Sequence, residues 1–361
     1  MNNDQKKSPV PEDSIGSIRS VSWHPRYREG VLELFSNVPH KAQLWQWEFE
    51  SNPFGKAFDP VLLVDREDQV VGFNGVMPIE ATAYGEPIDA LWSCDFHVVE
   101  SWRGKGLGSQ IKSVLHGKAK EVMAFGISDH ASRVLLHLGW KPDLRVRNYR
   151  LLRSSRGIRE WAFRAIQWLN RSLGLLGPRL SNCTITVQST LPDQASVNEL
   201  WEREKSGYSR IVKRSFEYLN WKYQRHPLAR YAFVCAWEHQ KLAAIMVVRF
   251  HGETLKIVDY AGPASNAALK RALVRRVRDH WRHALQLTVV TSDAQLGQCL
   301  RNEGFFSPRT RPRFYIHDSV ASENEPSRSW FIMAGDSDGE LLGAAAEFCR
   351  GYTVLNETEF N

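Results

Sequence analysis

A glycine-rich hexamer is the part of the sequence best suited to binding a phosphorylated ligand. Residues 103–108 read RGKGLG and lie between residues 91–99, which we predict to be a strand, and residues 108–121, which we predict to be a helix. Glycines let a backbone turn its N–H groups inward around an anion, and the positive end of the following helix adds to the attraction. The hexamer therefore predicts a phosphate site built mostly from backbone.

Two residues just before this loop are of types that can move a proton. Asp95 and His97 are two apart in the predicted strand, so we expect both side chains on one face, with Cys94 on the opposite face. A carboxylate and an imidazole placed together can take a proton from an ammonium group, directly or through water. The alternative is structural: His97 hydrogen-bonds a neighbouring strand, and Asp95 caps a turn or pairs with an arginine.

The order of strand, glycine-rich loop and helix resembles the GNAT superfamily of acyl-CoA-dependent N-acyltransferases. The pyrophosphate loop of that family reads Arg/Gln-x-x-Gly-x-Gly/Ala, which Arg103, Gly106 and Gly108 match. A second helical unit follows at residues 131–140 and ends in Gly-Trp, as the corresponding helix of the family often does. The resemblance extends over roughly residues 61–152.

The sequence departs from the family pattern at two positions of that second unit. Ser128 stands where the family usually has the Asn of an Asn-x-x-Ala start, and Ala131 matches the Ala. Leu135 stands where many members have a Tyr that donates a proton. The identity of a general acid therefore stays open.

The resemblance implies a mixed α/β, GNAT-like fold, acetyl-CoA as the acyl donor and no metal. In the family the strand before the loop bulges, and its free backbone groups bind the pantetheine arm of CoA, a role that falls by position to Val98 and Val99. The predicted cofactor-binding residues are Val98, Val99, Arg103, Gly104, Lys105, Gly106, Leu107, Gly108, Ser109 and Ser128. The predicted catalytic residues are Asp95 and His97.

An internal repeat indicates two such domains. Residues 44–53 read LWQWEFESNP and residues 218–227 read YLNWKYQRHP, so that Trp47 corresponds to Trp221. Each segment precedes a predicted pair of strands, at residues 61–64 and 70–77 in the first copy and at residues 231–237 and 242–250 in the second. Chance similarity of common residue types is the alternative.

The second copy is predicted to lack the phosphate site. Between its predicted strand, residues 254–261, and its predicted helix, residues 266–282, the sequence reads GPAS. Only Gly262 is a glycine there, and Pro263 removes a backbone donor. We therefore predict a degenerate second domain and one CoA per chain.

The full chain is divided accordingly. We predict a disordered tail at 1–14, an N-terminal GNAT-like domain with the acyl-CoA site at 15–153, a basic amphipathic linker helix at 154–182, a degenerate C-terminal GNAT-like domain at 183–340 and a C-terminal tail at 341–361. A length of 361 residues with 43% hydrophobic residues agrees with two domains. The five cysteines are scattered, which argues against a zinc ribbon or a disulfide framework and favours the cytoplasm.

The predicted linker has a composition of its own. Between residues 145 and 179 the sequence has nine arginines and one acidic residue, while Trp and Leu recur at helical spacing. Such a helix either packs its apolar stripe between the domains or lies on the inner, anionic face of the membrane. The sequence has no run of 18 apolar residues, so we predict no transmembrane helix.

The predicted function is the transfer of an acetyl group from acetyl-CoA to the primary amine of a small molecule by direct attack in a ternary complex. Resemblance to bacterial polysaccharide-associated GNAT proteins suggests an amino sugar as the acceptor. The alternatives are a Fem-type transferase that uses aminoacyl-tRNA and a non-catalytic CoA-binding protein. A net charge of +7 is modest for this length, and no nucleic-acid partner is expected; a homodimer remains an open alternative.

Overall fold

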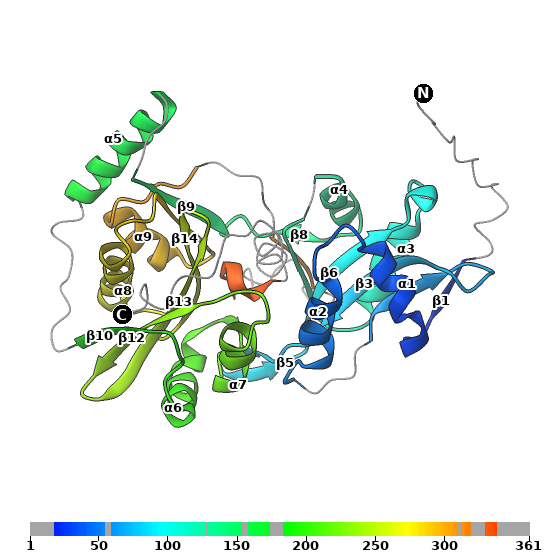
Figure 1. Ribbon diagram of the computed structural model, residues 1–361, viewed down its shortest axis with the longest axis horizontal. Helices are drawn as coiled ribbons and strands as arrows, with labels where there is room; N and C mark the ends of the chain where they lie inside the picture. The colour runs from blue at the N-terminus through cyan, green and yellow to red at the C-terminus, as the bar shows by residue number, and fades with distance from the viewer. Residues whose placement is uncertain are drawn as a thin grey trace.

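The computed structural model describes residues 18–54, 59–127, 129–153, 158–173, 183–308, 312, 314–318 and 329–337. Within these ranges the chain forms two large mixed sheets with helices packed on them, one in each half of an elongated molecule (Figure 1). The predicted tails at 1–14 and 341–361 lie outside the described residues. No described helix is long and apolar enough to cross a membrane.

The first sheet has the strand order β1-β2-β3-β6-β7-β16-β8. Its strands are β1 (Arg19–Val21), β2 (Val61–Val64), β3 (Val70–Met77), β6 (Ala90–Val98), β7 (Glu121–Phe125), β16 (Phe314–Asp318) and β8 (Lys141–Pro142). All four residues of β2 are buried, as expected for an apolar strand covered on both faces. The predicted strands at 61–64 and 70–77 have the bounds that the structure shows.

Helices cover both faces of this sheet. They are η2 (Pro25–Tyr27), α1 (Arg28–Leu34), α2 (Lys41–Trp45), the π-helix η3 (Gln46–Glu50), η4 (Glu100–Trp102), α3 (Leu107–His116) and α4 (Asp129–His137). Helix α3 buries Leu107, Ile111 and Leu115, which recur every four residues, against the sheet. It ends five residues before the predicted end at 121, where β7 already begins.

The second sheet has the order β10-β12-β13-β14-β15-β9. Its strands are β10 (Cys183–Gln188), β12 (Ala232–Glu238), β13 (Lys241–His251), β14 (Thr254–Ala261), β15 (Gln286–Thr291) and β9 (Arg147–Leu152). The accompanying helices are α5 (Ile158–Leu173), α6 (Gln194–Glu204), η6 (Lys205–Gly207), α7 (Phe216–Leu219), the π-helix η7 (Asn220–Gln224), α8 (Ala267–His280), α9 (Ala294–Asn302) and η8 (Ala334–Asp336).

The two halves exchange a strand. Strand β9 follows the first half in sequence but pairs antiparallel with β15 of the second sheet. Strand β16 comes from the second half and lies between β7 and β8 of the first sheet. The range 15–153, predicted as the first domain, therefore contains a strand of the second sheet. A third, small sheet also joins the halves, with β4 (Ala81–Ala83) and β5 (Glu86–Ile88) from one and β11 (Arg210–Val212) and β17 (Trp330–Phe331) from the other.

The internal repeat is confirmed by the order of the elements. Each half has a short α-helix running into a π-helix, then an antiparallel strand pair, a third strand and a helix that crosses to a parallel fourth strand. π-Helices are rare, so their occurrence at the same point of both copies, residues 46–50 and 220–224, is specific. The chain is a tandem duplication of one α/β unit.

Candidate active site

The first half opens between β6 and β7. These parallel strands pair only over Ala90–Trp92 and Glu121–Met123, and beyond that they separate. A cavity of about 270 Å³ lies in the opening. Its lining residues are Phe35, Val38, Ser93, Cys94, Asp95, Phe96, Lys112, Phe125, Gly126, Ile127, Ala131, Val134 and Leu135.

A β-bulge in β6 shapes one wall of this cavity. The pairing of β3 with β6 shifts register between Phe73 and Gly75, and Asp95 has a left-handed backbone with φ of 49°. A non-glycine residue in this conformation is uncommon and is held by its surroundings. A bulge leaves backbone groups of the longer strand without partners in the ladder.

Val98 and Val99, predicted to bind the pantetheine arm, lie about three residues beyond the bulge of β6. The Val99 N–H donates to the carbonyl oxygen of Val71 at 3.0 Å. The Val98 carbonyl accepts a hydrogen bond from Arg103 Nε at 3.0 Å. These backbone groups are thus used within the protein, whereas the bulge lies at Asp95 and Phe96, beside the cavity.

The bulge also changes which side chains share a face. A Cβ added to Gly75 would lie 3.1 Å from Cys94 Sγ and 3.4 Å from Asp95 Cβ. Both neighbours therefore lie toward the same side of the sheet, and the prediction that Cys94 points away from Asp95 is wrong. The extra residue of the bulge interrupts the strict alternation on which that prediction depended.

Asp95 is part of a buried charge cluster. Its carboxylate is ion-paired with Lys41 on α2, and Glu48 lies 3.8 Å from the same ammonium group. Burial alone would lower the pKa of Lys41, but Asp95 and Glu48 outweigh it and raise that pKa above its usual value. Lys41 thus stays charged and holds the Asp95 side chain at the edge of the cavity.

His97 lies on the same side of the sheet but is not one of the residues that line the cavity. Its ring packs edge-on against Phe35, with centroids 5.5 Å apart. Burial, followed by the nearby charge of Arg103, lowers the pKa of His97. The imidazole is therefore neutral near pH 7 and able to accept a proton.

The glycine-rich loop leads into α3 as a backbone nest. Gly104 and Gly106 have φ of 77° and 80°, the left-handed conformation that favours glycine, and Gly106 is the N-cap of α3. The N–H of Gln110 bonds to the carbonyl of Gly106, so the N–H groups of residues 107–109 precede the first intrahelical bond. Four predicted residues, Gly104, Gly106, Leu107 and Gly108, thus form one turn with open donors.

A cation lies at the same loop. Lys105 Nζ is 4.8 Å from the centroid of the Trp102 ring. Within the described residues this atom is buried and has no hydrogen-bond partner. An ammonium group on the same loop as open backbone donors fits a phosphate ligand.

The corresponding opening of the second half is filled by the chain itself. Helix η8 contacts both β14 and β15, and Ser292 N–H donates to the carbonyl of Ile332 at 2.9 Å. A Cβ on Gly335 would lie 2.9 Å from the carbonyl oxygen of Val258, next to the bulge of β14. The segment 332–336 therefore fills, between β14 and β15, the space that corresponds to the open cavity between β6 and β7 in the first half.

Solved structures resemble most of the chain. A probable N-acyltransferase from Enterococcus faecalis matches with 12% identity and a TM-score of 0.59, covering 84% of this chain and 72% of the other. A GCN5-related N-acetyltransferase from Anabaena variabilis matches with 11% identity and a TM-score of 0.58, covering 84% and 73%. N-myristoyltransferase from Saccharomyces cerevisiae matches with 14% identity and a TM-score of 0.50, covering 86% and 82%. No protein-family model and no curated protein matches the sequence.

The chain has a tandem GNAT fold. The repeated order of elements shows that the unit occurs twice, and the similar solved structures identify the fold of that unit as GNAT. In the GNAT fold of this chain, Leu135 is buried and lines the cavity, while Ser128 lies outside the described residues. Ser109 is half-buried in the first turn of α3.

Lys112 is a charged lining residue that was not predicted. Lys112 Nζ donates hydrogen bonds to Asn74 Oδ1 at 2.6 Å and to Ser93 Oγ at 2.8 Å, and its side chain is buried. The sequence could have indicated Lys112, because it lies on the apolar face of the helix with Ile111 and Leu115. A lysine buried on such a face needs a hydrogen-bond or charge partner. Among the described residues, no cluster of His, Cys, Asp or Glu is arranged to hold a metal.

Proposed function

We propose that the protein is an acyl-CoA-dependent N-acyltransferase that uses acetyl-CoA and acylates a primary amine. The observation that carries this proposal is that the open nest at residues 104–109 adjoins the bulge: a Cβ added to Gly108 would lie 3.3 Å from the Phe96 ring, and Phe96 lines the cavity between β6 and β7. Neighbouring structures named as N-acyltransferases, and one described with bound myristoyl-CoA, support the same donor class.

CoA fits this site from the nest to the cavity. The pyrophosphate would receive the N–H groups of residues 107–109, and Lys105 would add a positive charge. The pantetheine arm would then follow β6 to the bulge at Asp95 and Phe96, where backbone groups outside the ladder face the opening. This path replaces the one predicted through Val98 and Val99.

The reaction is a direct aminolysis of the thioester. The amine nitrogen forms a bond with the carbonyl carbon, the carbon–sulfur bond breaks, and the amine loses one proton while the thiolate gains one. A neutral His97 is suited to accept the proton that the amine loses. Because His97 is not one of the cavity-lining residues, this proton would pass through a water molecule. Lys112 is a cation on the cavity wall and would stabilise the leaving thiolate. It would serve in place of the proton-donating Tyr of the family, since residue 135 is Leu.

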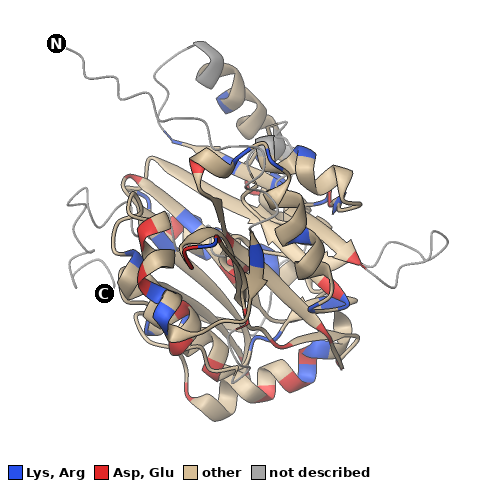
Figure 2. Cartoon of the chain, turned by 90° about the vertical axis from the view of Figure 1, so that its right-hand side faces the viewer, with Lys and Arg blue, Asp and Glu red and all other residues tan. Residues whose placement is uncertain are grey.

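The acceptor is proposed to be a small amine, with an amino sugar as the first choice from the sequence resemblance. The free cysteines at 94, 183, 235 and 299 agree with a reducing compartment, and we propose the cytoplasm. Figure 2, a view onto the first half, shows Lys and Arg interspersed with Asp and Glu along the described ribbons. We propose no nucleic-acid partner.

A turnover assay tests the proposal. Purified protein is mixed with acetyl-CoA and a panel of amines that includes amino sugars, and free CoA thiol is measured. We expect thiol release that depends on the amine and disappears in Gly106→Val. Binding of CoA without release for every amine would favour a non-catalytic CoA-binding protein, and release that requires charged tRNA would favour the Fem-type alternative.

A further inference from the structure

Helix α5 exposes an apolar face. Its inner side is attached to the second half, where the ring of Phe163 stacks on Phe306 at 4.4 Å and Gln167 hydrogen-bonds both backbone groups of Leu152. The exposed side carries Trp161, Ile166, Trp168 and Leu169, with exposures of 63%, 45%, 73% and 54%. The apolar stripe predicted for the linker thus does not pack between the domains at these positions.

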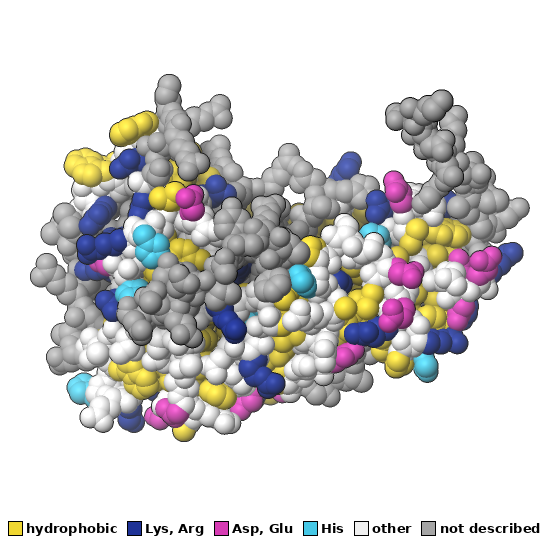
Figure 3. Space-filling model, viewed as in Figure 1, with side chains coloured by type: hydrophobic (Ala, Val, Ile, Leu, Met, Phe, Trp, Pro, Cys, Tyr) yellow, Lys and Arg dark blue, Asp and Glu magenta, His cyan; other side chains and the backbone are white. Residues whose placement is uncertain are grey.

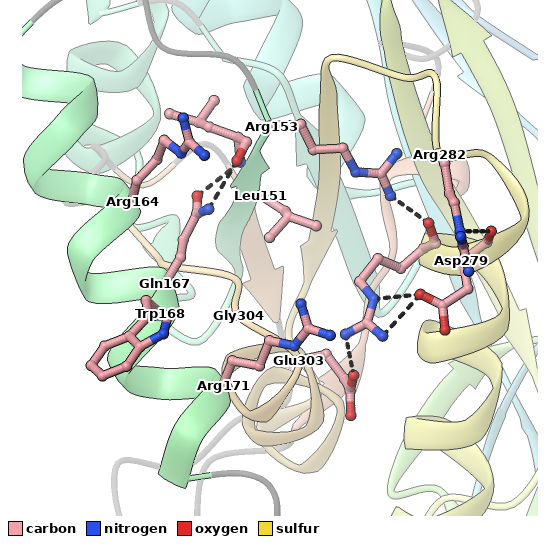
Figure 4. A pocket seen from close by; sticks show the side chains of 12 residues that line it. Leu151, Arg153, Arg164, Gln167, Trp168, Arg171, Asp279, Arg282, Glu303 and Gly304 are labelled. Carbon is pink, nitrogen blue, oxygen red and sulfur yellow. Dashed lines mark hydrogen bonds and ion pairs between the residues drawn. The ribbon is translucent and has the colours of Figure 1, made fainter.

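An arginine-lined cavity lies along the inner edge of the same helix. It measures about 630 Å³, between α5, the end of β9 and the C-terminal parts of α8 and α9 (Figure 4). Five arginines line it together with two carboxylates: Arg153, Arg164, Arg171, Arg278, Arg282, Asp279 and Glu303. Glu303 already accepts hydrogen bonds from Arg271, Arg275 and Arg278, so its charge is largely balanced. The cavity is therefore strongly basic.

The basic and apolar regions form one surface. The guanidinium of Arg164 lies 5.3 Å from the centroid of the Trp161 ring. Figure 4 shows Arg164 and Arg171 extending from α5, with Arg282 on the facing wall. Figure 3 shows yellow and dark-blue side chains next to one another at the corner that α5 occupies.

We propose that this surface docks on an anionic lipid bilayer. The exposed Trp and Leu side chains of α5 would enter the interfacial layer, where Trp is favoured, and the arginines would contact lipid phosphates. A second copy of this chain is a poorer occupant, because a symmetric contact through α5 would bring two arginine clusters together. The docking is independent of the acyl transfer, since the surface lies on the second half.

Co-sedimentation of the full-length protein tests this docking. The vesicles are phosphatidylcholine alone, or phosphatidylcholine with about one third phosphatidylglycerol, each at low and high salt. We expect binding to the anionic vesicles at low salt and release at high salt. The double variant Trp168→Gln/Leu169→Gln should reduce the bound fraction about tenfold, and Arg171→Gln should weaken binding at low salt only.

Matched controls use residues outside this surface. Leu144→Gln removes a side chain that is 68% exposed between β8 and β9, and Arg225→Gln removes an exposed arginine. Both should bind vesicles as the wild type does. Wild-type protein that stays in the supernatant, or equal binding by the double variant and Leu144→Gln, would overturn the proposal. A mass that halves in the double variant without lipid, measured by light scattering, would make the face a protein interface and also overturn it.

Discussion

Trp47 and Trp221 meet face to face where the two halves join. Their rings stack with centroids 4.8 Å apart, and each indole N–H donates to the backbone carbonyl of the other residue, at 3.0 and 2.9 Å. Such a reciprocal contact is usual between identical subunits related by a two-fold axis. Here it occurs within one chain, between equivalent residues of a duplicated unit.

Gly106→Val should abolish the thermal stabilisation that acetyl-CoA gives. At a hundredfold excess over Kd, a ligand that binds only the folded state adds about 2.7 kcal/mol. A branched side chain at φ of 80° distorts the nest, although a Cβ there meets no atom within 4 Å. Gly139→Val is the matched control, because Gly139 has φ of 82° and equally open space. An unchanged ligand-induced shift in Gly106→Val would contradict the assignment of the loop.

His97→Gln should lower turnover about a hundredfold while CoA binding stays near normal, as expected on loss of a general base. In the wild type, the rate should stay high as pH falls to the ordinary pKa of histidine, about 6.5, and decline only below it, because the pKa of His97 is lowered. The measurement is the pH profile of turnover at saturating acetyl-CoA. Wild-type rates in His97→Gln across this range would remove His97 from the mechanism.

Lys41 and Asp95 should be strongly coupled in stability. Asp95→Asn leaves Lys41 beside Glu48 alone, and breaking a buried pair by removing one partner typically costs about 3–5 kcal/mol. The triple variant Lys41→Met/Glu48→Gln/Asp95→Asn removes all three buried charges and keeps an Asn at the left-handed position, so it should recover much of this loss in denaturant unfolding. If the triple variant also recovers turnover, Asp95 is structural; if it is stable but inactive, Asp95 takes part in the reaction.

One chain should bind one CoA, although it has two GNAT-like units. The second opening is occupied by residues 332–336, and the carbonyl of Gly262 is bonded to the Tyr208 hydroxyl at 2.6 Å. Calorimetric titration measures the stoichiometry directly. A value near two would contradict this argument, and loss of all binding in Gly106→Val would place the single site in the first half.

Stability should fall as the pH drops from about 6.5 toward 4, in part through His116. Its ring stacks on His317 of β16 at 3.5 Å, and its Nε2 accepts from Trp140 at 2.6 Å. Burial, His317 and Lys112 lower the pKa of His116 to about 4, so the unfolded chain binds the proton first. His317→Phe should reduce this loss in chemical unfolding at several pH values, whereas His239→Asn, in an exposed turn, should not. If the free energy of unfolding had the same pH dependence in both variants, the assigned role of His116 would be contradicted.

Local features were predictable from the sequence, and long-range ones were not. The strands at 61–64, 70–77 and 254–261 follow from apolar runs between turns, and the glycine loop from its spacing. The bulge at Asp95 depends on pairing with β3 and on Lys41, which is 54 residues away in sequence. Pairing between distant segments leaves no periodic signal, so the exchange of β9 and β16 could not be inferred.

The strand exchange has a consequence for how the protein is made. Residues 147–152 are synthesised long before the other strands of the second sheet, with which they pair. The first sheet is complete only after residues 314–318 have been synthesised. Until then, β7 has an unpaired edge on the very strand that borders the cavity, and such edges invite pairing with other chains. The half that carries the candidate site is therefore completed last, by nearly the final strand of the described chain, so that a nascent or truncated polypeptide should have no finished cavity between β6 and β7.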